Sequence, residues 1–268
     1  MLKKLFTAML LFISLSYANP SDKSLDELLV LSGITEQFSQ FPDMIKMGMT
    51  EAQKNTTAIS ETKHKALLES VDKYILVSDI IENIRNALEI SMTEKEIQEL
   101  LTWYKSNLGK KITKAEEMAS TLEGYQNMMA SGELLLKDTK RVLLAKKLDT
   151  LIGATTLTIE LQLYTAITTT TAILSIIEPN VPLDIKKIES QLYPRIMESH
   201  GKIEEMVILS FVYAYKDISF ENLNTYINFS SQKTSMKMNG IVFQALNKGF
   251  QKSISKWAKN IAKIVIAK

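Results

Sequence analysis

The residues of this chain that could carry out chemistry are few and lie far apart in the sequence. His64 and His200 are the only histidines, and neither belongs to an HExxH zinc-binding pattern. Ser230 and Lys233 have the serine–lysine spacing of penicillin-recognising enzymes, but the further motifs of those enzymes are missing. We therefore predict that the protein is not an enzyme and that it holds no metal and no cofactor.

The carboxylates show no arrangement typical of a metal site. Glu116-Glu117 and Glu204-Glu205 are adjacent in sequence, and adjacent residues do not share a helix face, so we expect all four side chains to be solvated. Glu160 is more unusual, because it lies inside the long apolar stretch 149–177. An unpaired carboxylate in a buried helix is costly. Glu160 therefore either reaches a lysine, a threonine hydroxyl or solvent, or is the polar residue of a ligand cavity.

The composition favours an all-helical protein that folds without covalent crosslinks. Of the 268 residues, 46% are hydrophobic, and there are only 9 Gly and 5 Pro. The chain has no cysteine, which excludes disulfides, thiol catalysis and cysteine metal sites. The formal net charge is +2, but residues 222–268 hold eight lysines and no acidic residue, so the rest of the chain is acidic.

The first 18 residues have the pattern of a secretory signal peptide. Lys3 and Lys4 precede the apolar run Leu5–Leu15, and Ser16-Tyr17-Ala18 supplies a small-residue cleavage pattern. The alternative is an N-terminal membrane anchor, but this run is shorter than the roughly 20 residues that span a bilayer. We predict cleavage after Ala18 and a periplasmic or secreted location, for which nucleic acid is not an expected partner.

Helical periodicity predicts a series of helices in the first half of the chain. Ser24 and Glu27 form a capping-box pattern at the first helix, which ends at Gly33. Pro42 should bend or split a helix over 34–49. One long helix is then predicted over 60–90. Two helices are predicted over 92–125, which begin at a Thr93–Glu96 capping box and are separated by a break at Asn107 and Gly109. Beyond the break, the apolar face should continue through Ile112, Ala115, Met118, Ala119 and Leu122.

The second half is predicted to hold the most apolar helix. Gly132 should break the chain, residues 149–177 should form a buried central helix, and residues 178–182 (Glu-Pro-Asn-Val-Pro) should form a loop. Four further helices are predicted over 183–198, 203–215, 220–230 and 232–266, with Ser219 capping the third.

An internal repeat is visible in the helix-start patterns. Thr93-x-x-Glu96-Ile97-x-x-Leu100-Leu101-x-Trp103 aligns with Ser219-x-x-Asn222-Leu223-x-x-Tyr226-Ile227-x-Phe229 at a constant offset of 126 residues. We therefore predict an all-α, multi-helix bundle made of two related helical units, residues 24–130 and 131–268, that form one compact body.

Several strings resemble a known bacterial family. They are Leu28-Leu29-x-Leu31-Ser32-Gly33-Ile34-x-Glu36-Gln37 and, as its signature, Trp103-Tyr104-Lys105-Ser106-Asn107-Leu108-Gly109-Lys110-Lys111-Ile112. The family that they resemble is domain of unknown function 2059. Tyr215-Lys216-Asp217-Ile218-Ser219 is similar to its second copy, which here lacks the Leu-Gly pair over 230–234. The resemblance implies an exported helical protein with structural roles for Trp103, Tyr104, Ser106, Leu108 and Gly109, and it implies no established activity.

The C-terminal helix is the predicted interaction surface. Apolar residues from Phe250 to Ile264 recur every three or four positions, and lysines occupy the opposite side. This face could contact an anionic membrane or a partner, or the helix could pack on the core with its lysines in water. The candidate surface residues are Lys248, Lys252, Lys256, Trp257, Lys259 and Lys263.

Three functions are compatible with these patterns. The leading hypothesis is a non-catalytic binding or envelope-associated module whose apolar interior, or the groove between its two units, holds a partner helix or a lipid. The alternatives are a membrane-surface protein that uses the lysine-rich helix and an enzyme of unfamiliar design with Glu160 or His200 in a cleft. A deep groove would favour the first hypothesis.

Overall fold

A computed structural model of the chain describes residues 19–54, 60–177 and 183–266. Every regular element in these three ranges is an α-helix, so the predicted all-helical fold class is confirmed for the described residues. The predicted signal peptide and the predicted Glu-Pro-Asn-Val-Pro break lie outside them.

The N-terminal part of the described chain forms five helices. They are α2 (Asp22–Leu31), α3 (Ile34–Ser39), α4 (Phe41–Lys54), α5 (Glu61–Tyr74) and α6 (Val77–Ser91). The split between α3 and α4, next to Pro42, confirms one prediction. The cap predicted at Ser24 is wrong, because Ser21 caps α2. Ser24 is instead buried, and its hydroxyl donates to Oε1 of Glu94 at 2.7 Å.

The single helix predicted over 60–90 is also wrong. The backbone leaves the helical region at Ile75 (φ −99°, ψ 77°), and the Ile75 side chain is buried with Val71 and Trp257. This break allows α5 and α6 to change direction while both remain packed against the long C-terminal helix. The cause is tertiary packing, since no Gly or Pro marks the position.

The middle of the chain turns two sharp corners. The helices α7 (Glu94–Lys105), α8 (Asn107–Ala119) and α9 (Leu122–Leu135) follow one another with almost no loop. The capping box is confirmed, since Thr93 donates its N–H to Glu96 Oε2 at 2.8 Å and its hydroxyl accepts the Glu96 N–H at 3.3 Å. The break falls at Ser106, so Asn107 and Gly109 begin α8 and do not end α7.

Each corner requires a glycine at the third helical position. Ser106 accepts the N–H of Gly109, and Thr121 accepts the N–H of Gly124, both at 3.0 Å. A Cβ at Gly109 would lie 2.1 Å from the carbonyl oxygen of Trp103, and one at Gly124 would lie 2.2 Å from that of Met118. Gly132, by contrast, lies inside α9, so the break predicted there is wrong.

The second half contains longer helices. They are α10 (Thr139–Ile152), α11 (Ala154–Ile177), α12 (Ile185–Glu198), α13 (His200–Ala214), α14 (Phe220–Ser230) and α15 (Lys233–Ile266). Ser219 caps α14 as predicted, with its hydroxyl accepting the Asn222 N–H at 3.3 Å. Gly153, in the left-handed conformation (φ 77°), separates α10 from α11.

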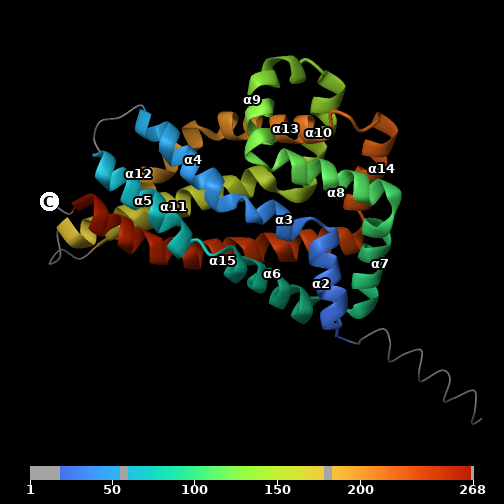
Figure 1. The fold of residues 1–268 in the computed structure, drawn as a ribbon, viewed down its shortest axis with the longest axis horizontal. Helices are drawn as coiled ribbons and strands as arrows, with labels where there is room; N and C mark the ends of the chain where they lie inside the picture. Colours follow the sequence, from blue (N-terminus) through green and yellow to red (C-terminus); the bar gives the residue numbers. More distant parts are fainter. Residues whose placement is uncertain (1–18, 55–59, 178–182, 267–268) are drawn as a thin grey trace, which may run out of the picture.

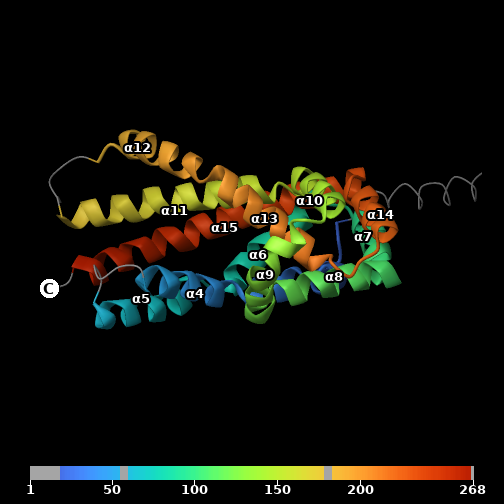
Figure 2. The same ribbon diagram turned by 90° about the horizontal axis from the view of Figure 1, so that it is seen from above.

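The central element is α15 and not the apolar stretch over 149–177. Helix α15 extends along the molecule (Figure 1), and the view from above shows α11 and α12 on one side of it and α4 and α5 on the other (Figure 2). It packs against α5, α6 and α11. Most residues of α11 are only partly buried, because one side of it faces solvent. No helix in the described part of the chain is long and apolar enough to cross a membrane.

One large core cluster joins both ends of the chain. It contains buried side chains from α2, α6, α7, α8, α10, α14 and α15, including Leu28, Ile84, Leu101, Ile227 and Phe250. The predicted units 24–130 and 131–268 therefore share one core.

The corner at Ser106 provides a test of the fold. We expect Gly109→Ala to destabilise the protein by about 1–3 kcal/mol, because the added methyl group overlaps a backbone carbonyl that cannot move independently. Gly240→Ala in α15 is the matched control: a Cβ there meets nothing within 4 Å, so it should be neutral or stabilise by up to about 1 kcal/mol. Urea unfolding followed by circular dichroism measures both, and equal effects would contradict the tight corner.

Candidate ligand cavity

A cavity of about 490 Å³ lies between the two halves of the chain. Its walls come from the N-terminal helices α3 and α4, the corner helices α7 to α9, and the C-terminal helices α10, α11, α13, α14 and α15. Most lining residues are apolar, and they include Phe38, Phe41, Met44, Met128, Leu157, Phe211, Met238, Val242, Phe243 and Leu246.

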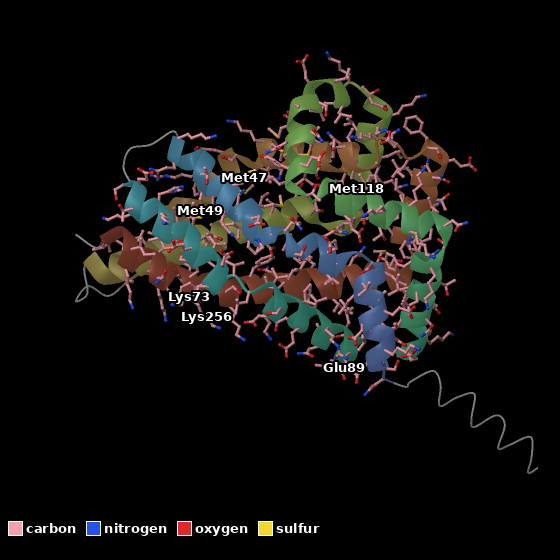
Figure 3. All side chains as sticks on the ribbon, in the orientation of Figure 1. Met47, Met49, Lys73, Glu89, Met118 and Lys256 are labelled. Carbon is pink, nitrogen blue, oxygen red and sulfur yellow. The ribbon has the colours of Figure 1, made fainter. Side chains whose placement is uncertain are left out.

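The cavity reaches the surface beside α4. Met44 is 36% exposed, while the other lining residues are buried or partly buried. Methionine side chains are flexible and adapt to irregular surfaces. Met47 and Met49, labelled in Figure 3, continue along the same helix beyond this entrance.

Glu116 is the polar centre of the cavity. Its Oε1 accepts hydrogen bonds from the hydroxyl of Tyr215 at 2.5 Å and from the hydroxyl of Tyr226 at 2.9 Å. Tyr215 follows α13 and Tyr226 lies in α14, so both donors come from the second half of the chain. The side chain of Gln37 in α3 also hydrogen-bonds this carboxylate. Four separate elements thus meet at one carboxyl group.

The environment favours the protonated form of Glu116. Burial raises its pKa, and the charge of Glu117 raises it further. The hydrogen bonds from Tyr215, Tyr226 and Gln37 act in the opposite direction, but the net pKa remains above the ordinary value. Among the described residues that line the cavity, Glu116 is the only one whose side chain is an acid, a lysine, an arginine or a histidine.

Three tyrosines surround this carboxyl group and remain protonated. Burial, followed by the charge of Glu116, raises the pKa of Tyr104, and the same two causes raise the pKa of Tyr215 and of Tyr226 well above the ordinary value. These phenols therefore act as hydrogen-bond donors and aromatic surfaces and not as bases.

The wall near α8 differs in polarity from the wall formed by α15. Helix α8 contributes Glu116 and Ala119, and Ser120 follows at its C-terminal end, whereas α15 contributes Val242 and Leu246 on consecutive turns, together with Phe243 and Met238. Asn239 is the polar lining residue of α15. The cavity is consequently polar near α8 and mainly apolar near α15.

Stacked aromatic rings hold the polar end in place. The ring of Trp103 stacks on Phe229 with centroids 4.3 Å apart and on Tyr226 at 6.0 Å. Tyr104 meets the edge of Phe229 at 5.8 Å. In the signature string, Tyr104 lines the cavity, Trp103 supports Tyr226, Leu108 packs on the core, and Ser106 and Gly109 form the corner.

Sequence reasoning missed this site because it placed Glu116 in solvent. The buried side of α8 contains Gly109, Ile112, Thr113 and Glu116, so the predicted apolar face is correct at Ile112 and Ala119 but wrong at Met118 and Leu122. Met118, which was assigned to that face, is 60% exposed (Figure 3). The sequence does contain one indication of this burial. Glu116 lies four residues after Ile112, so the two side chains share one face of the helix, and Ile112 belongs to the core.

The predicted cavity residue Glu160 does not line the cavity. Its side chain is exposed, and its carboxylate accepts a hydrogen bond from the amide of Asn247 at 2.7 Å. Of the two alternatives left open for Glu160, the structure agrees with contact to solvent and not with a place in the cavity. His64 and His200 lie on different helices, α5 and α13. The described residues contain no group of three His, Asp or Glu that could hold a metal ion.

The predicted surface of α15 divides into two parts. Its lysines, Lys248, Lys252, Lys256, Lys259 and Lys263, are exposed, and Lys256 lies at the outer edge of the molecule (Figure 3). Trp257 is not part of that surface. It is 7% exposed, and its indole N–H donates to the Ser70 hydroxyl at 2.7 Å. The apolar face that a membrane would need is thus covered by α5, α6 and α11.

The raised pKa of Glu116 predicts a pH-dependent contribution to stability. Between the unfolded value, about 4.3, and the higher folded value, the native protein binds more protons than the unfolded chain. The contribution is therefore complete below the unfolded pKa and is lost as the pH rises through the folded pKa. As the pH rises through this window, the free energy of unfolding of the unaltered protein should fall, relative to that of Glu116→Gln, by up to about 1.4 kcal/mol per pH unit.

Urea unfolding at a series of pH values measures this difference. Glu82→Gln, at an exposed position of α6, is the control and should keep a constant difference from the unaltered protein. A stability difference for Glu116→Gln that stays flat across the window would show that the carboxyl group is solvated.

No curated protein and no solved structure shows a significant match to the chain. A family match exists for the segment from α6 to just beyond α9, which carries both Tyr104 and Glu116. The family expected from the signature string is confirmed there: residues 78–137 match the model of domain of unknown function 2059, described as an uncharacterized protein conserved in bacteria.

Proposed function

We propose that this protein is an exported, non-catalytic module that binds an apolar ligand in the cavity next to Glu116. The observation that carries the proposal is the cavity itself. Its volume of about 490 Å³ is within the range of roughly 300–1,000 Å³ that is typical of small-molecule sites. Its lining also has the typical composition, which is an apolar surface with a few convergent polar groups.

The packing of the surrounding helices supports a ligand at this position. Protein interiors are close-packed, and covering apolar surface that water would otherwise contact is favourable. An apolar ligand would supply contacts to Phe38, Phe211, Phe243 and Leu157, which all line the cavity. The cavity lies between helices from both halves of the chain, so its shape depends on how these helices pack together and not on any one segment.

The chemistry of the cavity supports binding over catalysis. General acid–base catalysis usually combines a positioned acid or base with a second group that moves a proton or attacks the substrate. Here Glu116 is accompanied by tyrosines whose raised pKa keeps them protonated. Their hydroxyl groups donate to the carboxyl group and orient it, and the hydroxyl oxygens can accept a hydrogen bond from a ligand.

We further infer that the two halves, 24–130 and 131–268, are related copies. Helices α7 and α14 begin at Glu94 and Phe220, which are 126 residues apart. Helices α8 and α15 begin at Asn107 and Lys233, which have the same separation. Ile97 and Leu223, at equivalent positions, are both at most 1% exposed.

Contacts between the halves support the same inference, because equivalent residues take part in them. Lys237 of α15 donates to Glu96 near the start of α7 at 2.7 Å, and Lys111 of α8 donates to the carbonyl of Asp217 just before α14 at 3.5 Å. The two lysines are 126 residues apart and each reaches the other half, although their acceptors are not at equivalent positions. Trp103 and its counterpart Phe229 stack on each other, as equivalent residues do across a twofold axis.

Ligand binding can be tested with a neutral fluorescent probe, N-phenyl-1-naphthylamine. We expect the mature protein to bind it, and we expect Leu157→Trp, which fills part of the cavity, to weaken binding about tenfold or more, since one good apolar contact contributes more than the 1.4 kcal/mol of a tenfold change. Leu143→Trp, at a 67% exposed position of α10, is the matched control. Identical affinities for the two variants would place the probe elsewhere.

Export can be tested separately on the chain produced in a bacterial host. We expect the protein recovered from the periplasm or the medium to begin at Asn19, because cleavage after Ala18 follows the small-residue pattern. Intact-mass measurement checks this, and Ala18→Gln should leave the leader attached. A cytoplasmic protein that keeps residues 1–18 would contradict the export proposal.

A further inference from the structure

The cavity has a polarity that restricts what it can hold. This inference rests on the proposed binding function and names the chemical class of the ligand. Because no Lys, Arg or His is among the described lining residues, an anionic head group would find no cation and would face Glu116. An ionised carboxylate in such a place is itself costly when it is unpaired. The group that best complements it is a cation.

The tyrosines around Glu116 strengthen this argument. Cations bind favourably over aromatic faces, and Tyr104, Tyr215 and Tyr226 all line the cavity beside the carboxyl group. Tyr215 and Tyr226 both donate to Oε1, at 2.5 and 2.9 Å, so their hydroxyl groups stabilise the ionised form that a cation would need. A carboxylate within a group of aromatic rings is a recognition arrangement for ammonium ions.

The remaining space is apolar and of limited size. Beyond the polar end, the cavity is bounded by Leu157, Val242, Phe243 and Leu246, and it opens beside Met44. We propose that the cavity binds an amphiphilic amine, with its protonated nitrogen at Glu116 and its hydrocarbon part along α11 and α15.

Proton linkage gives this proposal a second, independent signature. The groups that face Glu116 are Tyr104 of α7, Tyr215 after α13, Tyr226 of α14, Gln37 of α3 and the neighbouring Glu117. The tyrosines and Gln37 keep the same charge from mildly acidic to neutral pH. Glu117 lies partly exposed beside Lys114, at 3.5 Å, outside the set that lines the cavity. Amine binding should therefore weaken as the pH falls and Glu116 takes up its proton.

The experiment compares three ligands of equal chain length: dodecylamine, dodecanol and dodecanoate. Each is titrated into the mature protein at neutral pH, below its micellar concentration, with displacement of N-phenyl-1-naphthylamine as the readout. We expect dodecylamine to bind about tenfold or more tightly than dodecanol, because a hydrogen bond to a charged group is stronger than one between neutral groups. Dodecanoate should bind most weakly.

Two variants separate this proposal from the general binding function. Glu116→Gln should abolish the preference for dodecylamine over dodecanol, and Glu82→Gln should keep the preference of the unaltered protein. Leu157→Trp should weaken binding of all three ligands. Equal affinities for the three ligands in the unaltered protein would overturn the ligand class and leave apolar binding intact, whereas failure of every ligand to bind would overturn both.

The unaltered protein supplies a test that does not depend on the folding of a variant. Lowering the pH from neutral towards about 4.3, the ordinary pKa of a glutamate, should weaken dodecylamine binding and leave dodecanol binding nearly constant. A parallel response of the two ligands would reject the role of Glu116 as the amine's partner.

Discussion

Burial of the apolar side of α15 is the interaction on which the rest of the structure depends. Phe250 and Leu246 on this helix are almost completely inaccessible, and each fully buried side chain of this size contributes roughly 1.5–3 kcal/mol. At 34 residues, α15 is about 50 Å long, so helices from both halves of the chain can pack along it. Its position also determines where the remaining helices leave an unfilled space.

The parts of the fold that could be predicted from the sequence are those that depend on local chemistry. The cap at Ser219, the capping box at Thr93 and the helix over 233–266 follow from hydroxyl-to-backbone hydrogen bonds and from a repeating apolar face, and both signals lie within a few residues. The interruption at Ile75 has no such signal. It exists because the side chain packs with Val71 and Trp257, of which Trp257 is distant in the chain, and sequence periodicity cannot report such a contact.

The same distinction explains why the cavity was not predicted. An acidic residue is expected in solvent unless buried partners can be identified. The partners of Glu116 are Tyr215 and Tyr226, which lie about 100 residues away in the sequence, so local patterns do not reveal them. Local rules tend to fail at functional sites, where a sequence departs from the pattern that would give the most stable core. The stretch 149–177 illustrates the opposite error, since its apolar composition suggested a buried helix and α11 is only partly buried.

The lining residues at matching positions near α8 and in α15 differ in polarity. Glu116 and Ser120 stand 126 residues before Val242 and Leu246, and all four line the same space. An acid and a hydroxyl group at two of these positions make one side of the cavity polar, and hydrocarbon side chains at the other two make the opposite side apolar. A molecule with one polar and one apolar end would therefore have a lower energy in one orientation than in the reverse one.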